Sequence, residues 1–334
     1  MDAPKISVII PLYNAEKFIR ECLISVLASK LKDYEVLVVD DCSTDNSLAE
    51  VKKLLPHFDG RLKIFSTEEN SGGPGLPRNI GIKNSSAKYI TFIDNDDMIL
   101  PDALENFYAL AESYGADIVH TEKCLYCVNE FDGKNLKIYY MAEKEKLVSA
   151  PTVVPVDLEY RMWHLIYGKW HCIPWSRLYR REFLLENKID FPARIQFGED
   201  FVFFVKCLCL AEKYLLVPHV TNLRRLVAPS GSHVHFETSE EAARSLLKIL
   251  TVKVAAVDEF ICGLEFFKAN PACRQDVLKF CMSVELRLLK NFFGRVPPHK
   301  VQEIFFDALQ NPALNPRGKN IFTAHLCAEK FSMR

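Results

Sequence analysis

Three carboxylates and one amide stand together in FIDNDD, residues 92–97, directly after a short apolar segment. Asp94 and Asp96 are one residue apart, so in an extended backbone their side chains project to the same side. One could accept a hydrogen bond from a ribose hydroxyl, while the other could help to hold a divalent ion. Magnesium and manganese take one or two carboxylates and fill their other positions with phosphate oxygens and water. For Asp97 we favour a helix-start acid, placed where the helix dipole attracts negative charge.

Polar residues also follow earlier apolar segments. The segments KISVII (5–10), YEVLVV (34–39), RLKIFS (61–66) and AKYITFI (87–93) alternate with helical patterns. This predicts βαβ units and a mainly parallel α/β sheet with helices on both faces. In such a sheet, ligands bind outside the carboxyl ends of the strands. The residues expected to share this edge are Pro11, Tyr13, Asn14, Asp40, Asp41, Ser43, Asn70, Asp94, Asn95, Asp96 and Asp97.

Asp41 and Tyr13 suit a nucleobase. Asp41 could accept a hydrogen bond from an imide-type base edge while Tyr13 packs on the face of the base. The alternative is that Asp40 or Asp41 caps the following helix, since Asp is a favoured cap residue. The residues alone leave both interpretations open.

The segment NSGGPGLPRNIGI (70–82) combines glycines and two prolines with Arg78 at the start of a helix. Helix N-termini and glycine-rich backbone suit phosphate oxygens, and arginine can pair with them through two hydrogen bonds. A surface turn explains the glycines equally well. Neither a dinucleotide-type glycine pattern nor a GxxxxGK[ST] loop is present, which argues against nicotinamide enzymes and P-loop phosphotransferases.

Composition narrows the class of protein. The chain has 334 residues, 49% hydrophobic and 25% charged, enough for one large domain with an appendage. With 42 basic and 43 acidic side chains, no overall field favours nucleic acid or an anionic membrane. The odd number of cysteines, 11, and the absence of a signal peptide indicate a reducing, cytoplasmic location. No apolar stretch reaches the ~20 residues of a membrane span.

The later chain changes character. A strand at 116–120 precedes a hairpin-like segment at 122–156 that turns at Asp132-Gly133, and two short strands are expected around 214–227. Trp170 and Trp175 could form a platform for sugar rings or could pack in the core. Arg224 and Arg225 could approach a diphosphate or lie on a solvated strand edge. From about 238 to 334 the pattern is helical, broken by prolines.

The order and spacing of several motifs resemble those of glycosyltransferase family 2. The motifs SVIIPLYNAEKFIRECLISVL, EVLVVDDCSTDNS, NSGGPGLPRNIGI and FIDNDD follow one another in that family's order, and PWSRLYRREFL and FGEDFVFF resemble its acceptor-side motifs. The resemblance covers roughly residues 4 to 230. It implies the GT-A fold, a Rossmann-like sheet, with the unmatched helical region appended. We therefore expect a catalytic domain at 1–235, with donor (1–121) and acceptor-side (122–235) parts, and a helical region at 236–334.

The resemblance also implies roles. It implies an inverting transfer from a nucleoside-diphosphate sugar, usually a UDP-sugar, to a glycan or lipid-linked saccharide. The cofactor it implies is Mn²⁺ or Mg²⁺. Asp200 would be the general base, and its alternative role is the N-cap of the following helix. The contacts implied by motif position are Pro11, Tyr13, Asp41, Arg78 and Asp94 for the nucleotide sugar, Asp96 for the metal and Glu199 for the acceptor. We add the neighbouring Asn14 and Asn95 to the nucleotide-sugar contacts, and Trp170 and Trp175 as acceptor contacts. His233 stands where some GT-A enzymes have a further metal ligand, and the alternative that we favour is an exposed loop residue.

Two departures from the family pattern stand out. Pro77 replaces the usual small residue before Arg78, which a first helical turn tolerates. TNLRR replaces the usual tyrosines before the late arginine. The rival hypotheses are a sugar nucleotidyltransferase, which lacks its expected basic glycine-rich start here, and a degenerate GT-A domain serving as a binding subunit. We further expect oligomers through the C-terminal helices and peripheral association with the inner membrane face.

Overall fold

The computed structural model describes residues 3–128, 137–140, 148–168, 170–193, 198–226, 238–293 and 295–312, with positions 316, 319, 320 and 323 beyond. The chain forms two compact units. Unit 1 comprises Met1–Gln196 and Phe203–Ser230, and unit 2 comprises Phe197–Val202 and Gly231–Arg334. The domain boundary expected at residue 235 stays a prediction.

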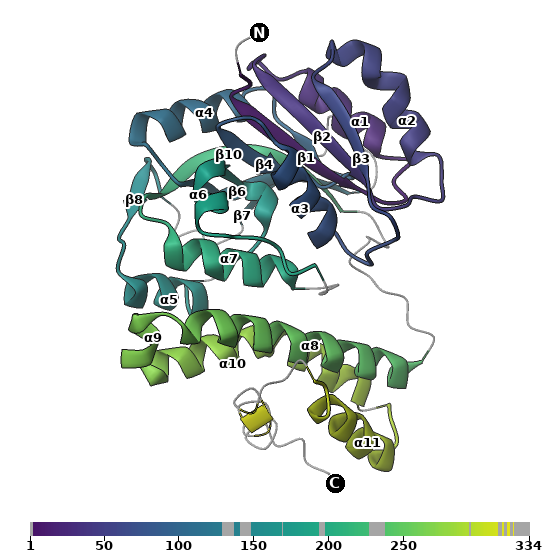
Figure 1. The fold of residues 1–334 in the computed structure, drawn as a ribbon, viewed down its shortest axis with the longest axis vertical. Coiled ribbons are helices and arrows are strands. Elements are labelled where there is room, and N and C mark those ends of the chain that lie inside the picture. The colour runs from purple at the N-terminus through teal and green to yellow at the C-terminus, as the bar shows by residue number, and fades with distance from the viewer. Residues whose placement is uncertain are drawn as a thin grey trace. The chain divides into compact units, whose positions relative to one another are not determined.

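Four parallel strands form the first half of the sheet in unit 1 (Figure 1). They are β1 (Ile6–Leu12), β2 (Tyr34–Asp40), β3 (Leu62–Ser66) and β4 (Tyr89–Phe92), in the spatial order β3-β2-β1-β4. Every residue of β1 and β2 is buried. Helices on both faces explain why these two strands have continuous apolar sequences. The predicted parallel α/β sheet is confirmed here.

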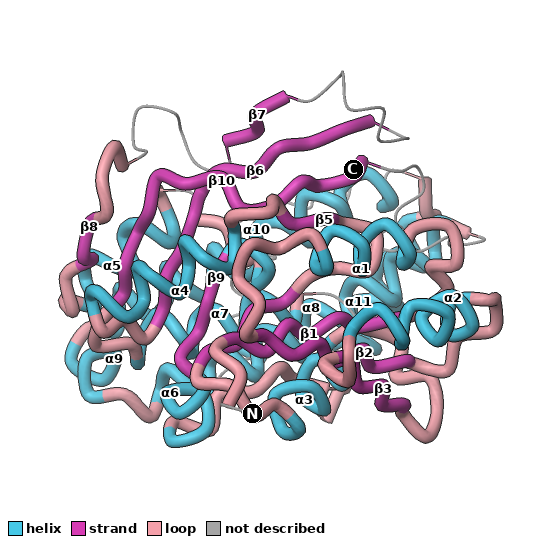
Figure 2. Tube along the Cα trace, turned by 90° about the horizontal axis from the view of Figure 1, so that it is seen from above, coloured by secondary structure: helices cyan, strands magenta, loops and turns pink. Residues whose placement is uncertain are grey.

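The second half of the sheet is mixed. β9 (Arg177–Arg180), preceded by the short turn η3 (Pro174–Ser176), runs antiparallel between β4 and β6 (Ile118–Val128). Next come β10 (Tyr214–Leu226) and β5 (Met98–Ile99), while β7 (Lys137–Tyr140) pairs with β6 and β8 (Thr152–Val154) with β10 (Figure 2).

Two expectations for this half need correction. β6 pairs antiparallel with β7, which confirms the two strands expected in the hairpin-like segment, but β6 begins at Ile118, so the strand expected at 116–120 and the first hairpin strand are one strand. β10 is one strand instead of two, and its register with β6 shifts between Val217 and Leu223. Such irregularities resemble chain breaks in a sequence because they interrupt the two-residue alternation. The Asp132-Gly133 turn lies outside the described residues.

Helices cover both faces of the parallel strands. The apolar cluster that contains Val8 and Val38 includes residues of α1 (Ile19–Leu27), α2 (Ser47–Leu54) and α4 (Ala103–Tyr114). Side chains alternate along β1, so Ile9 points to the other face, where α3 (Gly75–Asn84) packs. The remaining helical segments here are η1 (Leu55–Phe58), α5 (Leu158–Ile166), α6 (Arg181–Glu186) and α7 (Glu199–Leu210), which begins in unit 2.

The other described residues of unit 2 are mainly helical, which confirms the predicted C-terminal helices. Unit 2 contains α8 (Ser239–Cys262), α9 (Glu265–Ala269), α10 (Pro271–Phe293) and α11 (Pro298–Leu309). Thr238 caps α8 by accepting a hydrogen bond from the Glu241 N–H. The buried Asp258 pairs with Arg274 between α8 and α10, so the charge is compensated. Among the described residues, no helix is long and apolar enough to cross a membrane.

The contact between α3 and β1 gives a stability test. A Cβ atom at Gly81 would lie 2.4 Å from Cγ2 of Ile9, closer than packed atoms approach. We therefore expect Gly81→Ala to lower the free energy of unfolding by about 1–3 kcal/mol, the usual cost of overpacking. Denaturant unfolding measures the change, with Lys83→Ala on the exposed side of α3 as the control. Equal stability of the two variants would contradict this packing.

Candidate active site at the strand ends

The parallel register brings four strand ends to one edge. Leu12 pairs with Asp40, and Asp40 with Ser66, so β1, β2 and β3 end at the same level. The segment after β4 continues alongside β1, and Asn95 Nδ2 donates a hydrogen bond to the Pro11 carbonyl at 3.1 Å. Two of the predicted residues are therefore in direct contact.

The loop after β1 is tied to the loop after β2 by Asn14. Its Oδ1 accepts hydrogen bonds from the Thr44 N–H at 2.8 Å and the Thr44 hydroxyl at 3.3 Å. Asn14 has φ +45°, a left-handed conformation that asparagine tolerates better than most residues. Tyr13 is 47% exposed next to this junction. Its ring can therefore pack on a planar ligand, while Asn14 fixes the loop that carries it.

Asp41 is buried and holds the glycine-rich loop. Its Oδ1 accepts hydrogen bonds from the Thr67 hydroxyl at 2.9 Å and the Ser71 N–H at 3.0 Å, and its Oδ2 accepts one from the Ser71 hydroxyl at 2.9 Å. α2 begins at Ser47 without a side-chain cap, so the helix-cap alternative is wrong for Asp41. The sequence analysis missed Thr67 and Ser71, whose types carry no signal by themselves.

Arg78 lies in the first turns of α3 and meets the end of β4. Its side chain is 3% exposed, and the guanidinium donates to Asp94 Oδ1 at 2.9 Å and stands over the Phe191 ring at 5.2 Å. Pro77 fits because the N–H groups of a first turn need no helical partner. Asp94 remains 34% exposed. Arg78 thus orients Asp94, and the partial exposure of the Asp94 side chain keeps it accessible to a ligand.

Of the three carboxylates after β4, that of Asp96 forms the fewest hydrogen bonds with other described residues. Among the described residues, no side chain donates a hydrogen bond to it or pairs with it. Burial, and then the neighbouring charge of Asp94, raise its pKa to about 6. No group of three or more metal-ligating side chains occurs among the described residues. A hard-oxygen donor of this kind fits a divalent ion that takes most of its ligands from phosphate and water. His233 lies outside the described residues.

Asp97 corrects an expectation. It is buried, burial raises its pKa well above the ordinary value, and its Oδ1 accepts the backbone N–H of Arg225 at 2.8 Å. α4 begins only at Ala103, so the helix-start interpretation is wrong. The role of Asp97 follows from its burial against β10, and the local sequence pattern of a helix start contains no information about such burial. Asp97 fastens β10 to the acidic segment.

Arg225 is likewise buried, not on a solvated strand edge. Its guanidinium pairs with Glu21 of α1, donates from Nε to the Asp96 carbonyl at 3.2 Å and stands over the Phe18 ring at 5.1 Å. Glu21 and Arg225 are 204 residues apart in the chain. No local pattern could have identified this pair.

The two acceptor-side tryptophans are not platforms. Trp170 is 5% exposed and stacks on the His164 ring at 4.9 Å and parallel to Tyr214 at 5.8 Å. Trp175 is 3% exposed and packs with Cys124. A sugar ring needs an open indole face, so the platform interpretation is wrong for both residues and the core alternative holds.

Glu199 and Asp200 belong to unit 2, in the first turn of α7. The helix follows Gly198, whose φ of +82° suits glycine, and begins at Glu199. Asp200 is therefore inside the helix and is not its N-cap. Glu199 is buried, and Asp200 is partly exposed. The roles assigned to this pair stay predictions.

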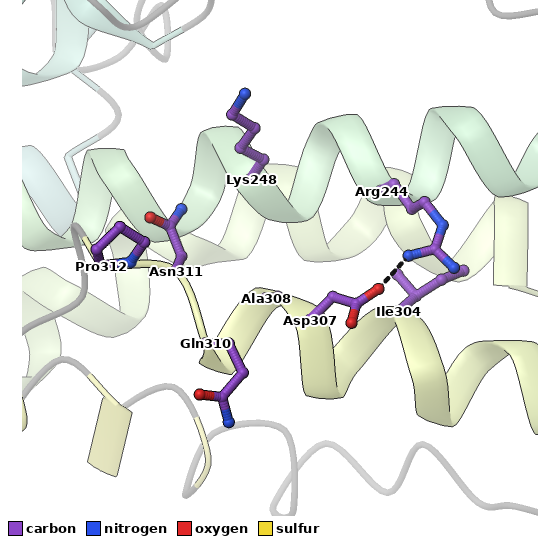
Figure 3. A pocket seen from close by; sticks show the side chains of 8 residues that line it. All are labelled: Arg244, Lys248, Ile304, Asp307, Ala308, Gln310, Asn311 and Pro312. Carbon is purple, nitrogen blue, oxygen red and sulfur yellow. Dashed lines mark hydrogen bonds and ion pairs between the residues drawn. The ribbon is translucent and has the colours of Figure 1, made fainter.

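Unit 2 also contains a cavity of about 400 Å³ (Figure 3). Two of its charged groups, Arg244 and Asp307, pair with each other, and Arg244 also pairs with the nearby Glu303. Asn311 donates to the Thr251 hydroxyl at 2.9 Å. These contacts hold α8 and α11 together and indicate a structural role. The lining residues are Arg244, Lys248, Ile304, Asp307, Ala308, Gln310, Asn311 and Pro312.

Comparison with solved structures defines the fold as GT-A. The crystal structure of Staphylococcus aureus TarS 1–349 matches with a TM-score of 0.66 and 22% identity, covering 98% of this chain and 91% of that chain. TarS 1–349 in complex with UDP-GlcNAc matches with a TM-score of 0.58. The chain belongs to glycosyltransferase family 2, whose model, described as Glycosyl transferase family 2, matches residues 7–186.

Relatives with assigned names are similar over part of their length. The poly(ribitol-phosphate) beta-N-acetylglucosaminyltransferase TarS of S. aureus is 32% identical over 211 residues, 63% of this chain and 33% of TarS. The poly(ribitol-phosphate) beta-glucosyltransferase of Bacillus spizizenii is 34% identical over 232 residues, 69% of this chain and 33% of that protein. The chain thus spans about a third of these relatives. Glycosyltransferase GlyG of Streptococcus pneumoniae is 26% identical over 261 residues, 78% of this chain and 82% of GlyG.

The raised pKa of Asp96 predicts a pH-dependent stability. The folded pKa of about 6 exceeds the ordinary 3.8, so the carboxylate destabilises the ligand-free protein progressively as pH rises from about 4 to about 6 and fully above that range. Asp96→Asn should raise the free energy of unfolding by about 1–2 kcal/mol at pH 8, after allowance for solvent screening. The gain should vanish near pH 4. Thermal unfolding across this range measures it, with the exposed Asp59→Asn as control. A gain of the same size at pH 4 and pH 8 would contradict the cause given.

Proposed function

We propose that this chain is an inverting, metal-assisted glycosyltransferase whose donor is a nucleoside-diphosphate sugar. Among such donors we propose a UDP-sugar. The observation that carries the proposal is the arrangement after β4. Arg78 orients Asp94, and Asp96 stands next to it without a protein donor among the described residues. Membership of glycosyltransferase family 2 supports a transferase, and intact acids argue against a degenerate binding subunit.

The donor would lie along the strand ends. Tyr13 packs on the base at the exposed edge, and Asp41 either accepts a hydrogen bond from the base or keeps the loop of residues 67–71 in place beneath it. Asp94 accepts a hydrogen bond from a ribose hydroxyl through Oδ2, while its Oδ1 accepts the hydrogen bond from Arg78. The hydrogen bond between Asn95 and the Pro11 carbonyl joins the segments after β1 and β4. It therefore sets the distance between the residues that contact the base and the residue that contacts the ribose. Nucleotide binding then strengthens contacts that are already in place.

Asp96 would hold Mn²⁺ or Mg²⁺ together with the diphosphate. A bound divalent ion would neutralise the negative charge that grows on the leaving diphosphate. Asp96 is suited to this because its raised pKa reflects an unfavourable buried charge that a cation relieves. With one or two protein carboxylates, the ion would depend on the nucleotide for tight binding. We therefore expect metal and nucleotide to bind cooperatively.

Asp200 would act as the general base in a single displacement. It takes the proton of the acceptor hydroxyl as that oxygen bonds to the anomeric carbon. The bond from this carbon to the diphosphate oxygen breaks, and the nucleoside diphosphate leaves with the electron pair. One such step inverts the anomeric centre and needs one base. Glu199, the buried neighbour of Asp200, would contact the acceptor.

The acceptor class comes from the relatives. Two of them are named for transfer to poly(ribitol-phosphate), so we propose a polyol-phosphate or related surface glycan as acceptor. None of the cysteines that the structure describes forms a disulfide, which supports the proposed reducing compartment. We place the protein at the inner face of the membrane within this proposal. Membrane association and oligomer formation through the C-terminal helices remain part of this proposal.

Asp200→Asn separates binding from catalysis. The variant should keep the affinity of the wild type for UDP and lose transfer by a factor of about 10²–10⁴, the usual effect of removing a general base. Release of UDP from a panel of UDP-sugars, with a polyol-phosphate polymer as acceptor, measures the rate. Asp102→Asn, which removes an acid that makes no capping hydrogen bond at α4, is the matched control. Undiminished transfer by Asp200→Asn would remove this residue from its role.

Asp96→Ala tests the metal. In the wild type, added Mn²⁺ should restore transfer after treatment with a chelator, because the ion stabilises the leaving group. In Asp96→Ala that restoration should fall about 10²-fold or more, as when a single stabilising contact to the leaving group is removed. Full restoration of the variant at the wild-type Mn²⁺ concentration would exclude Asp96 as the ligand.

A further inference from the structure

A second cavity, of about 310 Å³, lies in unit 1 between β6, β8, the start of β10 and α5. This volume is at the lower end of the range for small-molecule sites. Val153 and Tyr160 line it and are 53% and 40% exposed, so the cavity opens to solvent. None of the residues assigned above to the nucleotide or the metal lines it. It is therefore separate from the strand-end site.

The cavity contains a buried acid, one of whose oxygens lacks a hydrogen bond from the residues that the structure describes. Glu122 of β6 lines it and is 5% exposed. Among the described residues, its Oε1 has no hydrogen-bond partner. Burial raises the pKa of this carboxyl to about 7, and the buried Arg177 offsets the rise only in part. A buried carboxyl without a hydrogen bond is costly, so a ligand that donates hydroxyl groups would relieve this cost.

Aromatic rings surround the same opening. Tyr160 and His164 line the cavity, and the buried Trp170, whose ring is stacked between His164 and Tyr214, borders it without offering an open face. Trp163 of α5 and Tyr167, the C-cap residue of that helix, are 48% and 55% exposed, and their spacing from Tyr160 puts all three on neighbouring turns. Apolar ring surface next to a carboxylate acceptor suits a molecule with both C–H faces and many hydroxyls. Asp157 and Glu159 flank the start of α5, which disfavours an anionic ligand at the opening.

We propose that this cavity binds a neutral polyhydroxylated unit, a sugar or polyol residue of the acceptor, and that Glu122 accepts hydrogen bonds from its hydroxyls. Identification of that unit as part of the acceptor rests on the proposed glycosyltransferase function. The binding itself does not. The exposed rings of α5 would extend the contact to neighbouring units of a polymer, so the site would favour chains over single sugars.

Tryptophan NMR reads out the cavity without donor, metal or turnover. The full chain has three tryptophans, so labelling with ¹⁵N gives three indole N–H signals, assigned by single tryptophan-to-phenylalanine variants. Ribitol and methyl glucoside at about 100 mM should shift the Trp170 signal saturably, since this concentration detects a Kd of that order. Trp175, which does not line the cavity, is the internal reference, and propanol is the apolar control.

Glu122→Met tests the carboxylate. It keeps the side-chain size while removing the acid, so polyol affinity should fall about tenfold to a hundredfold. The same variant should melt at a higher temperature than the wild type, because it removes an uncompensated buried polar group. Glu159→Met, an exposed acid at the start of α5, should change neither property.

Three results would overturn the site: no response at Trp170, an equal response in Glu122→Met, or a lower melting temperature of that variant. The last would show that the carboxylate serves the fold. If Trp170 responds but the wild type transfers no sugar, the proposed function fails and the polyol site stands. With an acceptor that supports transfer, Glu122→Met should raise its KM and leave UDP affinity unchanged, and weakened UDP binding would contradict the assignment.

Discussion

The structure depends on a balance of charge at the end of β4. Asp94, Asp96 and Asp97 follow one another within four residues, and mutual repulsion would disfavour such a segment without compensation. Two buried arginines provide it. Arg78 pairs with Asp94, and Arg225 donates its backbone N–H to Asp97 and its Nε to the Asp96 carbonyl. The Asp96 carboxylate is left with a raised pKa, so the site is prepared for a cation that the protein itself does not supply.

The rest of unit 1 holds this balance in place. The parallel register brings the ends of β1, β2 and β3 level, which puts the Asn14 and Asp41 loops side by side with the acidic segment. Asp41 then fixes the glycine-rich loop through Ser71, and that loop begins the helix that carries Arg78. A change in any of these hydrogen bonds would therefore reach the ion pair with Asp94. The site is a property of the sheet edge and does not reside in one motif.

The sequence predicted the parallel strands and their polar ends because both depend on local patterns. Continuous apolar runs identify β1 and β2, and the rule that ligands bind at the carboxyl ends of parallel strands identifies the polar residues that follow them. The sequence-based predictions failed where the role of a residue depends on its burial or on a partner far away in the chain. Asp97 has the local pattern of a helix-start acid but is held by β10, and Trp170 resembles a platform but stacks on Tyr214. The pair of Glu21 with Arg225 has no local signature, and neither has Glu122 Oε1, which lacks a hydrogen bond within the described part of the chain.

Calorimetry of UDP binding to the wild type, with and without Mn²⁺, tests the central claim most directly. The account predicts saturable binding of one UDP per chain that is at least about tenfold tighter with Mn²⁺, a coupling of about 1.4 kcal/mol between nucleotide and metal. Binding unchanged by the metal would contradict the role of Asp96. Absence of UDP binding under both conditions would contradict the UDP donor site at the strand ends.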